Sequence, residues 1–339
     1  MAARTRAIYG CAGKDLAPNE RAFFRTARPW GFILFARNIT DREQVRRLVG
    51  ELRQTVDDGG APVLIDQEGG RVMRLRPPEW QNRPPARRFG ELHVTAPAAA
   101  REAAYLNARL IAHDLDDLGI TVDCTPVLDV PVPGANNVIG DRAFSSDTAM
   151  IIDLGRAVIG GLLDGGVLPV MKHVPGHGRA NADSHLALPR VSTTAGELAS
   201  TDFVPFHSLS DCPLAMTAHV VYEDIDSERP ATTSPTVIGR IIREEIGFQG
   251  LLLSDDLSMK ALRGPLAART KGALSAGCDI ALHCNGKMDE MEDVAREAMP
   301  LEDEILRRAE KALACQRSPE PLDIERAEFR VLELLGATV

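Results

Sequence analysis

The amino-acid sequence predicts a single (β/α)8 barrel, a closed cylinder of eight parallel strands with helices around it. Short apolar runs rich in β-branched residues recur along the chain, and segments of helical period separate them, as in successive βα units. These runs number eight, and the 339 residues exceed the roughly 250 that are typical of this fold. The expected strands are residues 7–12, 31–36, 63–68, 120–125, 167–173, 213–219, 250–255 and 279–284.

The segments between the runs carry the signals of helices that pack on a barrel. Within residues 98–118, leucines recur at spacings of three to five, which aligns them on one helix face. Residues 40–43 and 194–197 fit the capping box, in which a threonine hydroxyl and a glutamate carboxylate accept N–H groups at a helix start. Residues 301–316 and 324–335 are expected to form two further helices. We therefore expect one catalytic domain over residues 1–339, with 302–339 as a helical extension packed on the barrel.

Composition and charge exclude several classes of protein. Apolar residues make up 44% of the chain and charged residues 26%, which is typical of a globular protein. The net charge of -9 and the scattered lysines and arginines exclude a nucleic-acid partner. No run reaches the roughly 18 to 20 apolar residues of a membrane span, so no membrane partner is expected. Residues 1–6 lack the apolar segment of a secretory signal, which predicts a cytoplasmic location.

Cysteine usage points away from disulfides and structural zinc. Six cysteines are spread over the chain without a CxxC pair. We therefore expect most of the cysteines to be small buried side chains, and we expect neither a metal nor another cofactor.

Charged and imidazole side chains follow several of the apolar runs at the point where each run ends. Asp66 and Glu68 follow one run, Lys172 and His173 another, and His219 and Asp255 two more. In a barrel the carboxyl ends of all strands meet at one mouth, where the active sites of this fold are built. Buried charges are costly unless they are paired, so a barrel without a function would not need them there. The sequence therefore predicts one pocket lined by ionisable groups.

The segment after the fifth run carries a candidate proton donor and acceptor. Gly176 and Gly178 favour a flexible loop. Asp183 and His185 lie two residues apart, so in an extended segment both side chains project to the same side. The carboxylate can then hold one imidazole tautomer and stabilise its charged form, which makes an acid/base pair on a loop that can close over substrate.

Residues 250–256 form an apolar run that ends in two adjacent aspartates. Side chains alternate along a strand, so one carboxylate points to the barrel axis and the next points away. We assign Asp255 to the axis, where a carboxylate can attack an anomeric carbon and form a glycosyl ester. Asp256 is expected to be a hydrogen-bonding partner or a helix cap.

Four segments, in order along the chain, resemble family 3 glycoside hydrolases. They are residues 65–74, 139–144, 172–178 with 183–185, and 254–259, and the resemblance runs from about residue 31 to residue 286. Within that family they are similar to the bacterial β-N-acetylglucosaminidases of cell-wall recycling. Val174 and Met73 depart from the family pattern, which usually has Phe and commonly Gln at these positions.

The resemblance implies a role for each matched residue. Asp255 matches the nucleophile, His185 the general acid/base and Asp183 its partner. The positions that grip the terminal sugar are matched by Asp66, Arg74, Arg142, Lys172 and His173. Arg37, Asn38 and His219 match positions near the pocket.

The expected activity is that of a retaining exo-β-N-acetylglucosaminidase. It would remove terminal β-linked N-acetylglucosamine from peptidoglycan fragments, such as those ending in anhydro-muramic acid with or without peptide, through a covalent glycosyl-enzyme. We expect a monomer that acts in peptidoglycan recycling and so serves cell-wall biogenesis, cell shape and cell division.

Alternatives remain open at this point. The same family includes β-glucosidases, β-xylosidases and glycoside phosphorylases. A metal-dependent barrel hydrolase could use His173, His177, His185 and Asp255, although the Lys172 cation disfavours a metal there. A sugar-binding barrel without catalysis would leave the nucleophile and the acid/base pair unexplained.

Overall fold

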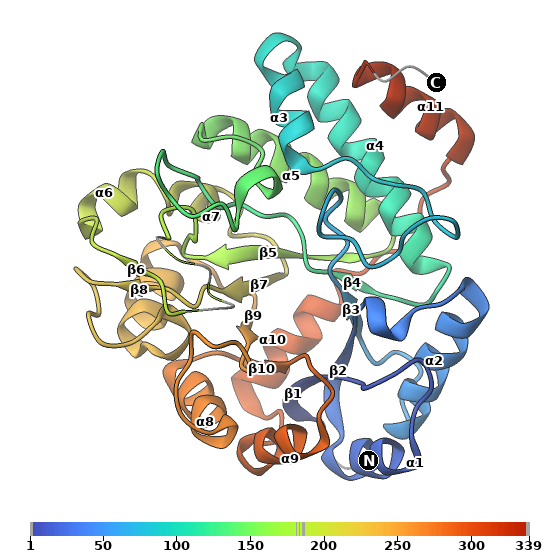
Figure 1. Cartoon of the computed structure of the whole chain (residues 1–339), viewed down its shortest axis with the longest axis vertical. Helices are drawn as coiled ribbons and strands as arrows, with labels where there is room; N and C mark the ends of the chain where they lie inside the picture. The colour runs from blue at the N-terminus through green and yellow to red at the C-terminus, as the bar shows by residue number, and fades with distance from the viewer. Residues whose placement is uncertain (1–2, 181, 183, 185–186, 337–339) are drawn as a thin grey trace.

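The computed structural model describes residues 3–180, 182, 184 and 187–336. In this described part, eight parallel strands close into a barrel in the order β1-β10-β9-β7-β5-β4-β3-β2. Helices surround the barrel, and Figure 1 looks into the end where the strands finish. The predicted (β/α)8 fold is confirmed. The barrel strands are β1 (Thr5–Gly10), β2 (Pro29–Leu34), β3 (Val63–Ile65), β4 (Val122–Asp123), β5 (Leu168–Val174), β7 (Leu214–Thr217), β9 (Leu251–Asp256) and β10 (Ile280–His283).

The helices fill the connections between strands. In chain order they are α1 (Pro18–Ala27), η1 (Ala36–Asn38), α2 (Arg42–Thr55), α3 (Ala86–Thr95), α4 (Pro97–Asp116), η2 (Gly140–Arg142), α5 (Thr148–Asp164), α6 (Ala195–Ser200), α7 (Val204–Ser208), η3 (Ala231–Thr233), the π-helix η4 (Val237–Glu245), α8 (Leu266–Ala276), α9 (Met288–Glu297), α10 (Asp303–Leu313) and α11 (Ile324–Leu334). Within the described residues, no helix has the length and apolar character needed to cross a membrane.

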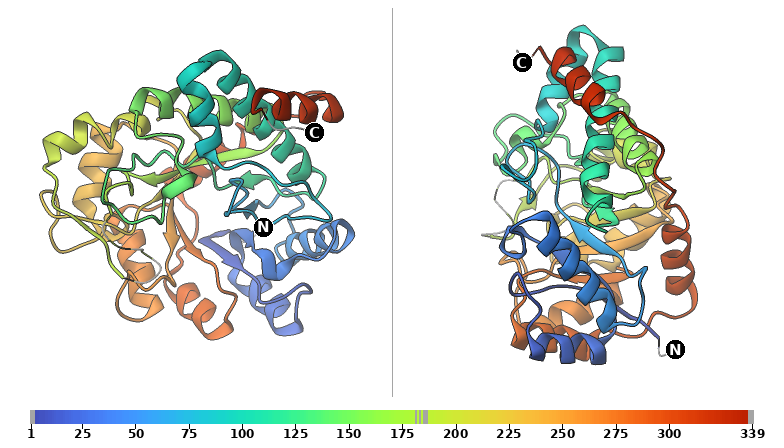
Figure 2. Two further views of the ribbon diagram at one scale, coloured as in Figure 1. Left: turned by 45° about the horizontal axis from the view of Figure 1, so that its top comes forward. Right: turned by 90° about the vertical axis from the view of Figure 1, so that its right-hand side faces the viewer.

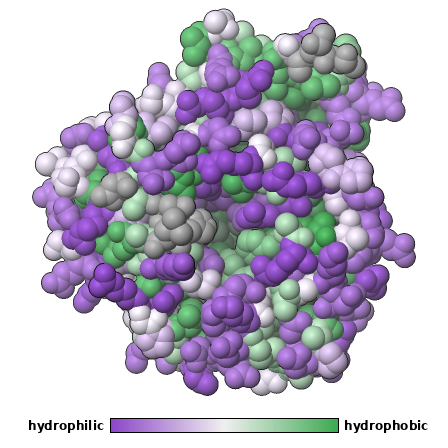
Figure 3. Space-filling view, in the orientation of Figure 1, coloured by the Kyte–Doolittle hydropathy of each residue, from purple (hydrophilic) through white to green (hydrophobic). Residues whose placement is uncertain are grey.

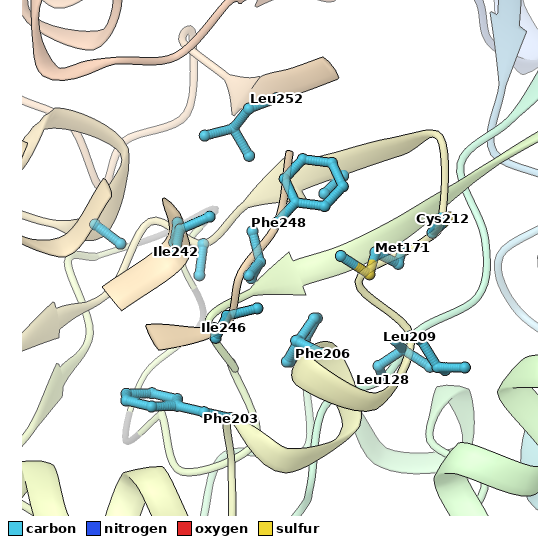
Figure 4. Close-up of a cluster of buried hydrophobic side chains, with 14 of the residues drawn as sticks. Leu128, Met171, Phe203, Phe206, Leu209, Cys212, Ile242, Ile246, Phe248 and Leu252 are labelled. Atoms are coloured by element: carbon cyan, nitrogen blue, oxygen red, sulfur yellow. The ribbon is translucent and has the colours of Figure 1, made fainter. Parts of the chain in front are cut away.

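Because side chains alternate along each strand, the barrel has an inner core, enclosed by the strands, and an outer core, between the strands and the surrounding helices. On β5, Val170 packs inside the barrel, whereas Met171 packs outside against the helices. On β9, Leu253 faces inward and Leu252 faces outward in the same way. Figure 4 shows part of the outer core, in which Phe206 and Phe248 lie between the sheet and its helices. Because each strand is buried on both faces, its run is continuously apolar until it reaches the mouth.

The two C-terminal helices pack on the barrel at different places. Ala309 and Ala312 of α10 join the inner core, and Figure 2 shows α10 on the side opposite the strand-end loops. Ala327 and Val331 of α11 pack against Leu110 of α4. Since α10 and the inner core fill the barrel from below, a ligand can enter only from the mouth.

Two local features differ from the sequence prediction. Helix α2 is capped by Asp41, whose carboxylate accepts the N–H of Gln44 at 2.9 Å, so the capping box expected at residues 40–43 was wrong by one residue. The prediction overlooked the short parallel pair β6 (Arg190–Val191) and β8 (Val221–Tyr222), which ties the loop after β5 to the loop after β7. Strands of two residues leave no periodic signal in a sequence.

Asp279 provides a test of how α10 is held on the barrel. Its carboxylate is 2% exposed and pairs with Arg308 of α10 at 2.9 Å and with Arg243 of η4 at 2.7 Å. Asp279→Ala leaves two guanidinium groups without their shared partner, so we expect the free energy of unfolding to fall by about 3 to 5 kcal/mol. Urea denaturation measures it.

The matched control is Asp293→Ala, which removes a solvent-facing pair with Arg296 within α9. It should cost at most about 1 kcal/mol. Equal losses for the two variants would contradict the role given to Asp279.

Candidate active site

The strand-end polar residues named above, with the exception of His219, line a single pocket at the mouth, with a volume of about 280 Å³. Figure 3 shows a recess near the middle of this face with hydrophilic residues beside it. The polar residues that line the pocket are Asp66, Glu68, Arg71, Arg74, Arg142, Lys172, His173, His177, Ser184, Asp255 and Asp256. We call this space the mouth pocket.

Strand parity explains which side chains reach the mouth pocket. Leu64, Val170 and Leu253 all face the barrel interior. Side chains two residues further along a strand face the same way, and these are Asp66, Lys172 and Asp255. All three line the mouth pocket.

Lys172 is the centre of the charged network. Its ammonium Nζ lies 2.9 Å from Asp66 Oδ1 and 2.7 Å from Glu68 Oε1, and the side chain is only 2% exposed. Burial alone would lower the pKa of Lys172, but the two carboxylates outweigh it and raise the pKa above its ordinary value. Lys172 is therefore charged at neutral pH.

Two arginines complete the network. Arg74 binds Asp66 at 2.8 Å, and Arg142 forms a two-pronged pair with Glu68 at 2.9 and 2.8 Å. Burial acts to raise the pKa of both carboxyls, but the cations prevail: the pKa of Asp66 is lowered, and that of Glu68 falls to about 2. The sequence analysis placed Glu68 at the end of the same apolar run as Asp66 but gave it no role of its own in the site.

His173 is held by Asp129, a residue that the sequence analysis overlooked. The ring Nδ1 of His173 lies 2.7 Å from Asp129 Oδ2, and the backbone N–H of His177 donates to Asp129 Oδ1 at 2.6 Å. Burial opposes ionisation of Asp129, but His173 and the other donors lower its pKa below the ordinary value. Burial lowers the pKa of His177 to about 4, so its ring is neutral at pH 7.

The two aspartates at the end of β9 have different environments. Asp256 accepts the N–H and the hydroxyl of Ser258 at 3.0 and 2.6 Å, which confirms the hydrogen-bonding role expected for it. Asp255 lines the mouth pocket, and its Oδ1 accepts the N–H of Asp256 at 2.7 Å. His219 lies 3.0 Å from the carbonyl oxygen of Asp256 through Nε2, while its Nδ1 contacts the Thr232 hydroxyl at 2.7 Å. His219 therefore holds the β9 backbone beside Asp255 and does not line the pocket.

Arg37 and Asn38 support the rim of the barrel. Arg37 donates to the carbonyl oxygens of Cys11 and Cys284, and Asn38 donates to those of Cys11 and Gly13. Neither residue lines the mouth pocket. They fix the strand ends around it.

The predicted acid/base pair, Asp183 and His185, lies outside the described residues. The intervening Ser184 lines the mouth pocket, and its hydroxyl lies 3.2 Å from His177 Nε2. Within the described part of the chain, no group of three or more His, Cys, Asp or Glu side chains could hold a metal ion. His185, one of the four residues of the metal set named above, lies outside the described residues.

The fold and the pocket together fit a class of barrel enzymes that have carboxylates and other polar side chains at the mouth. The chain matches the family described as "Glycosyl hydrolase family 3 N terminal domain" over residues 21–313. A β-hexosaminidase of Thiobacillus denitrificans is 40% identical over 280 residues, covering 81% of this chain and 76% of that protein. A β-hexosaminidase of Alkalilimnicola ehrlichii is 41% identical over 285 residues, covering 82% of this chain and 80% of that protein.

A solved structure is similar over almost the whole chain. The crystal structure of NagZ from Neisseria gonorrhoeae in complex with N-trifluoroacetyl-D-glucosamine has a TM-score of 0.88 and 30% identity, covering 98% of each chain. The chain therefore belongs to glycosyl hydrolase family 3, and it is a glycoside hydrolase of the β-N-acetylhexosaminidase type.

Asp123 provides a test of the electrostatics behind the site. It is fully buried at the end of β4, and within the described residues its Oδ2 has no hydrogen-bond partner. Burial raises the pKa of Asp123 to about 8 from 3.8. Between these two pKa values, Asp123 has lost its proton in the unfolded chain but keeps it in the folded protein. A rise in pH across this range therefore lowers the free energy of unfolding. Above about pH 8 both states are deprotonated, and Asp123 makes the free energy of unfolding no more dependent on pH.

Asp123→Asn keeps a neutral side chain at every pH. We expect the variant's advantage over the wild type in free energy of unfolding to grow between pH 4 and about 8 and then to level. Urea denaturation at one-unit steps of pH measures it. A difference that does not change with pH would contradict a neutral buried carboxyl at this position.

Proposed function

We propose that the protein is a retaining exo-β-N-acetylglucosaminidase that acts on peptidoglycan fragments. The observation that carries the proposal is the mouth pocket, in which the inward carboxylate of Asp255 shares one space with Asp66, Lys172 and His173. A carboxylate nucleophile beside groups that can chelate hydroxyls is the requirement for a covalent glycosyl intermediate.

The sugar-gripping residues suit an uncharged, hydroxyl-rich ligand. Among the described residues, Asp66, Arg74, Arg142, Lys172 and His173 present charged or polar groups to the pocket. The charges of the whole lining balance, because the cations Arg71, Arg74, Arg142 and Lys172 are matched in number by the carboxylates Asp66, Glu68, Asp255 and Asp256. Ion-paired groups keep spare donors and acceptors for neighbouring sugar hydroxyls. The relative from Neisseria gonorrhoeae was solved with N-trifluoroacetyl-D-glucosamine, which supports an N-acetylglucosamine unit as the ligand.

The depth of the site favours cleavage at a chain end. The inner core lies directly below Lys172 and is completed by Leu301, Ala309 and Ala312 at the closed end of the barrel. The mouth pocket is therefore closed below and has a volume of about 280 Å³, which suits a single terminal sugar and supports exo action.

In the proposed reaction, a carboxylate oxygen of Asp255 attacks the anomeric carbon while protonated His185 gives its proton to the leaving glycosidic oxygen. The bond to the leaving group breaks as the glycosyl ester forms. Neutral His185 then takes a proton from water, which attacks the same carbon and releases Asp255, so the anomeric configuration is retained. Asp183 holds the His185 ring and stabilises its charged form. His219 aids the attack by fixing the backbone carbonyl that follows Asp255.

We further propose the cellular setting implied by the family resemblance. The substrate is N-acetylglucosamine linked to anhydro-muramic acid, with or without peptide, and the protein acts in the cytoplasm as a monomer without a cofactor.

Two substitutions test the roles of Asp255 and His185. Asp255→Ala removes the nucleophile and should lower kcat on an aryl β-N-acetylglucosaminide by roughly 10³-fold or more. His185→Ala should lower kcat by about 10²- to 10⁴-fold on a natural disaccharide and by less on an aryl glycoside, because a good leaving group needs less protonation. Initial rates on both substrates measure these changes, and mass spectrometry of a muropeptide digest should find the loss of one N-acetylhexosamine.

Asp289→Ala, on the exposed start of α9, is the control and should keep the wild-type rate. Near-wild-type turnover by both site variants would overturn the assigned roles. Release of glucose or xylose in preference to N-acetylglucosamine from a panel of aryl glycosides would overturn the substrate.

A further inference from the structure

Asp129 lies directly behind His173, on the side away from the mouth pocket. Its carboxylate is completely buried, in the segment that follows β4. The neighbouring Leu128 donates its N–H to the carbonyl of Lys172 at 2.8 Å, which fixes this segment against the end of β5. Asp129 is therefore rigidly placed relative to His173.

The hydrogen bonds of Asp129 determine where the proton on His173 resides. Oδ1 accepts two backbone N–H groups, from His177 at 2.6 Å and from His173 at 3.3 Å. Oδ2 faces the ring Nδ1 of His173 at 2.7 Å. An ionised carboxylate can only accept, so Nδ1 must carry the hydrogen. In the neutral ring, Nε2 then carries a lone pair.

Nε2 of His173 has two neighbours that could donate to its lone pair, the Arg142 guanidinium and a ligand in the mouth pocket. Nε2 lies 3.5 Å from Nη2 of Arg142, at the long limit of a hydrogen bond. His173 lines the mouth pocket, so a ligand hydroxyl can approach this ring. Among the described residues, the other side chain that hydrogen-bonds Arg142 is the acceptor Glu68. An Nε2–H on His173 would instead point a donor at an arginine N–H.

We propose that Asp129 is a positioning residue that fixes the Nδ1–H tautomer of His173, so that this part of the pocket wall accepts a hydrogen bond from one hydroxyl of the bound sugar. The inference rests on the proposed function, since the ligand is taken to be a sugar. It adds a specificity rule: one hydroxyl of the substrate must act as a donor. A fluorine at that position can accept but cannot donate, and the site would reject it.

Asp129→Asn reverses the tautomer with little change in shape. The amide oxygen can still accept the two backbone N–H groups, which leaves the amide N–H₂ facing Nδ1 of His173. The ring must then accept at Nδ1 and carry its hydrogen on Nε2, opposite Arg142. The pocket would offer a donor where it had offered an acceptor.

The first test uses ¹⁵N NMR of the ligand-free full chain, with the His173 signal assigned by its loss in His173→Gln. We expect Nδ1–H in the wild type and Nε2–H in Asp129→Asn. The matched control is Asp202→Asn, since Asp202 is also buried nearby but binds Arg179 at 2.7 Å and not His173. That variant should keep Nδ1–H. A wild-type ring with hydrogen on Nε2 would overturn the proposal, even if Asp129→Asn failed to fold.

The second test measures kcat/KM on aryl β-N-acetylglucosaminides in which each free hydroxyl in turn is replaced by fluorine. In the wild type, we expect fluorine at one position to lower kcat/KM by roughly tenfold or more compared with fluorine at the other positions, where its effect is electronic only. In Asp129→Asn the parent substrate should suffer a similar loss, and the extra penalty at that position should disappear. An equal loss on every substrate would mean a structural role only and would contradict the proposal.

The two tests separate this inference from the function on which it rests. A wild-type protein that cleaves no N-acetylglucosaminide, yet has the expected His173 tautomer, would refute the proposed function alone. A wild-type protein that cleaves the parent glycoside but has the opposite tautomer would refute the role of Asp129 alone.

Discussion

The buried ammonium of Lys172 is the constraint on which the site depends. An unpaired charge in a barrel interior would carry a desolvation penalty of several kcal/mol, so Lys172 can remain there only while Asp66 and Glu68 contact it. Arg74 and Arg142 in turn hold these carboxylates from the outer side. The network joins the ends of β3 and β5 to the short helix η2, and it gives the pocket polar groups whose positions are fixed before a ligand arrives.

The alternating direction of side chains along each strand determines whether an aspartate at its end reaches the mouth pocket. Asp66 and Asp255 continue inward-facing rows and meet the pocket, whereas Asp123 follows the outward parity at the end of β4. The pKa values reflect this difference. Cations overcome the burial of Asp66 and lower its pKa, but burial prevails at Asp123 and raises its pKa to about 8. Aspartate is thus a charged, ion-paired side chain on the inward face of the strands, at Asp66, and a neutral buried side chain on the outward face, at Asp123.

The eight barrel strands and the inward position of Asp255 could be predicted because apolar runs and two-residue alternation are local signals. Glu68 and Asp129 could not be assigned, since their roles come from partners 74 and 44 residues away in the chain. A signal for Asp129 did exist: it is a lone carboxylate inside the apolar segment 126–130, where burial demands donors. The cap of α2 was misplaced because Thr40 and Asp41 are both good capping residues, and only the backbone geometry chooses between them.

The central claim is that the pocket holds a sugar with its anomeric carbon against Asp255. The most direct measurement is to trap the intermediate with a 5-fluoro N-acetylglucosaminyl fluoride, which slows both steps, and to locate the label by peptide mass spectrometry. The account predicts one fluoro-N-acetylglucosaminyl group bound as an ester to Asp255, in the peptide that contains the end of β9. A label on another carboxylate, or turnover by a wild-type enzyme that never carries a label, would contradict it.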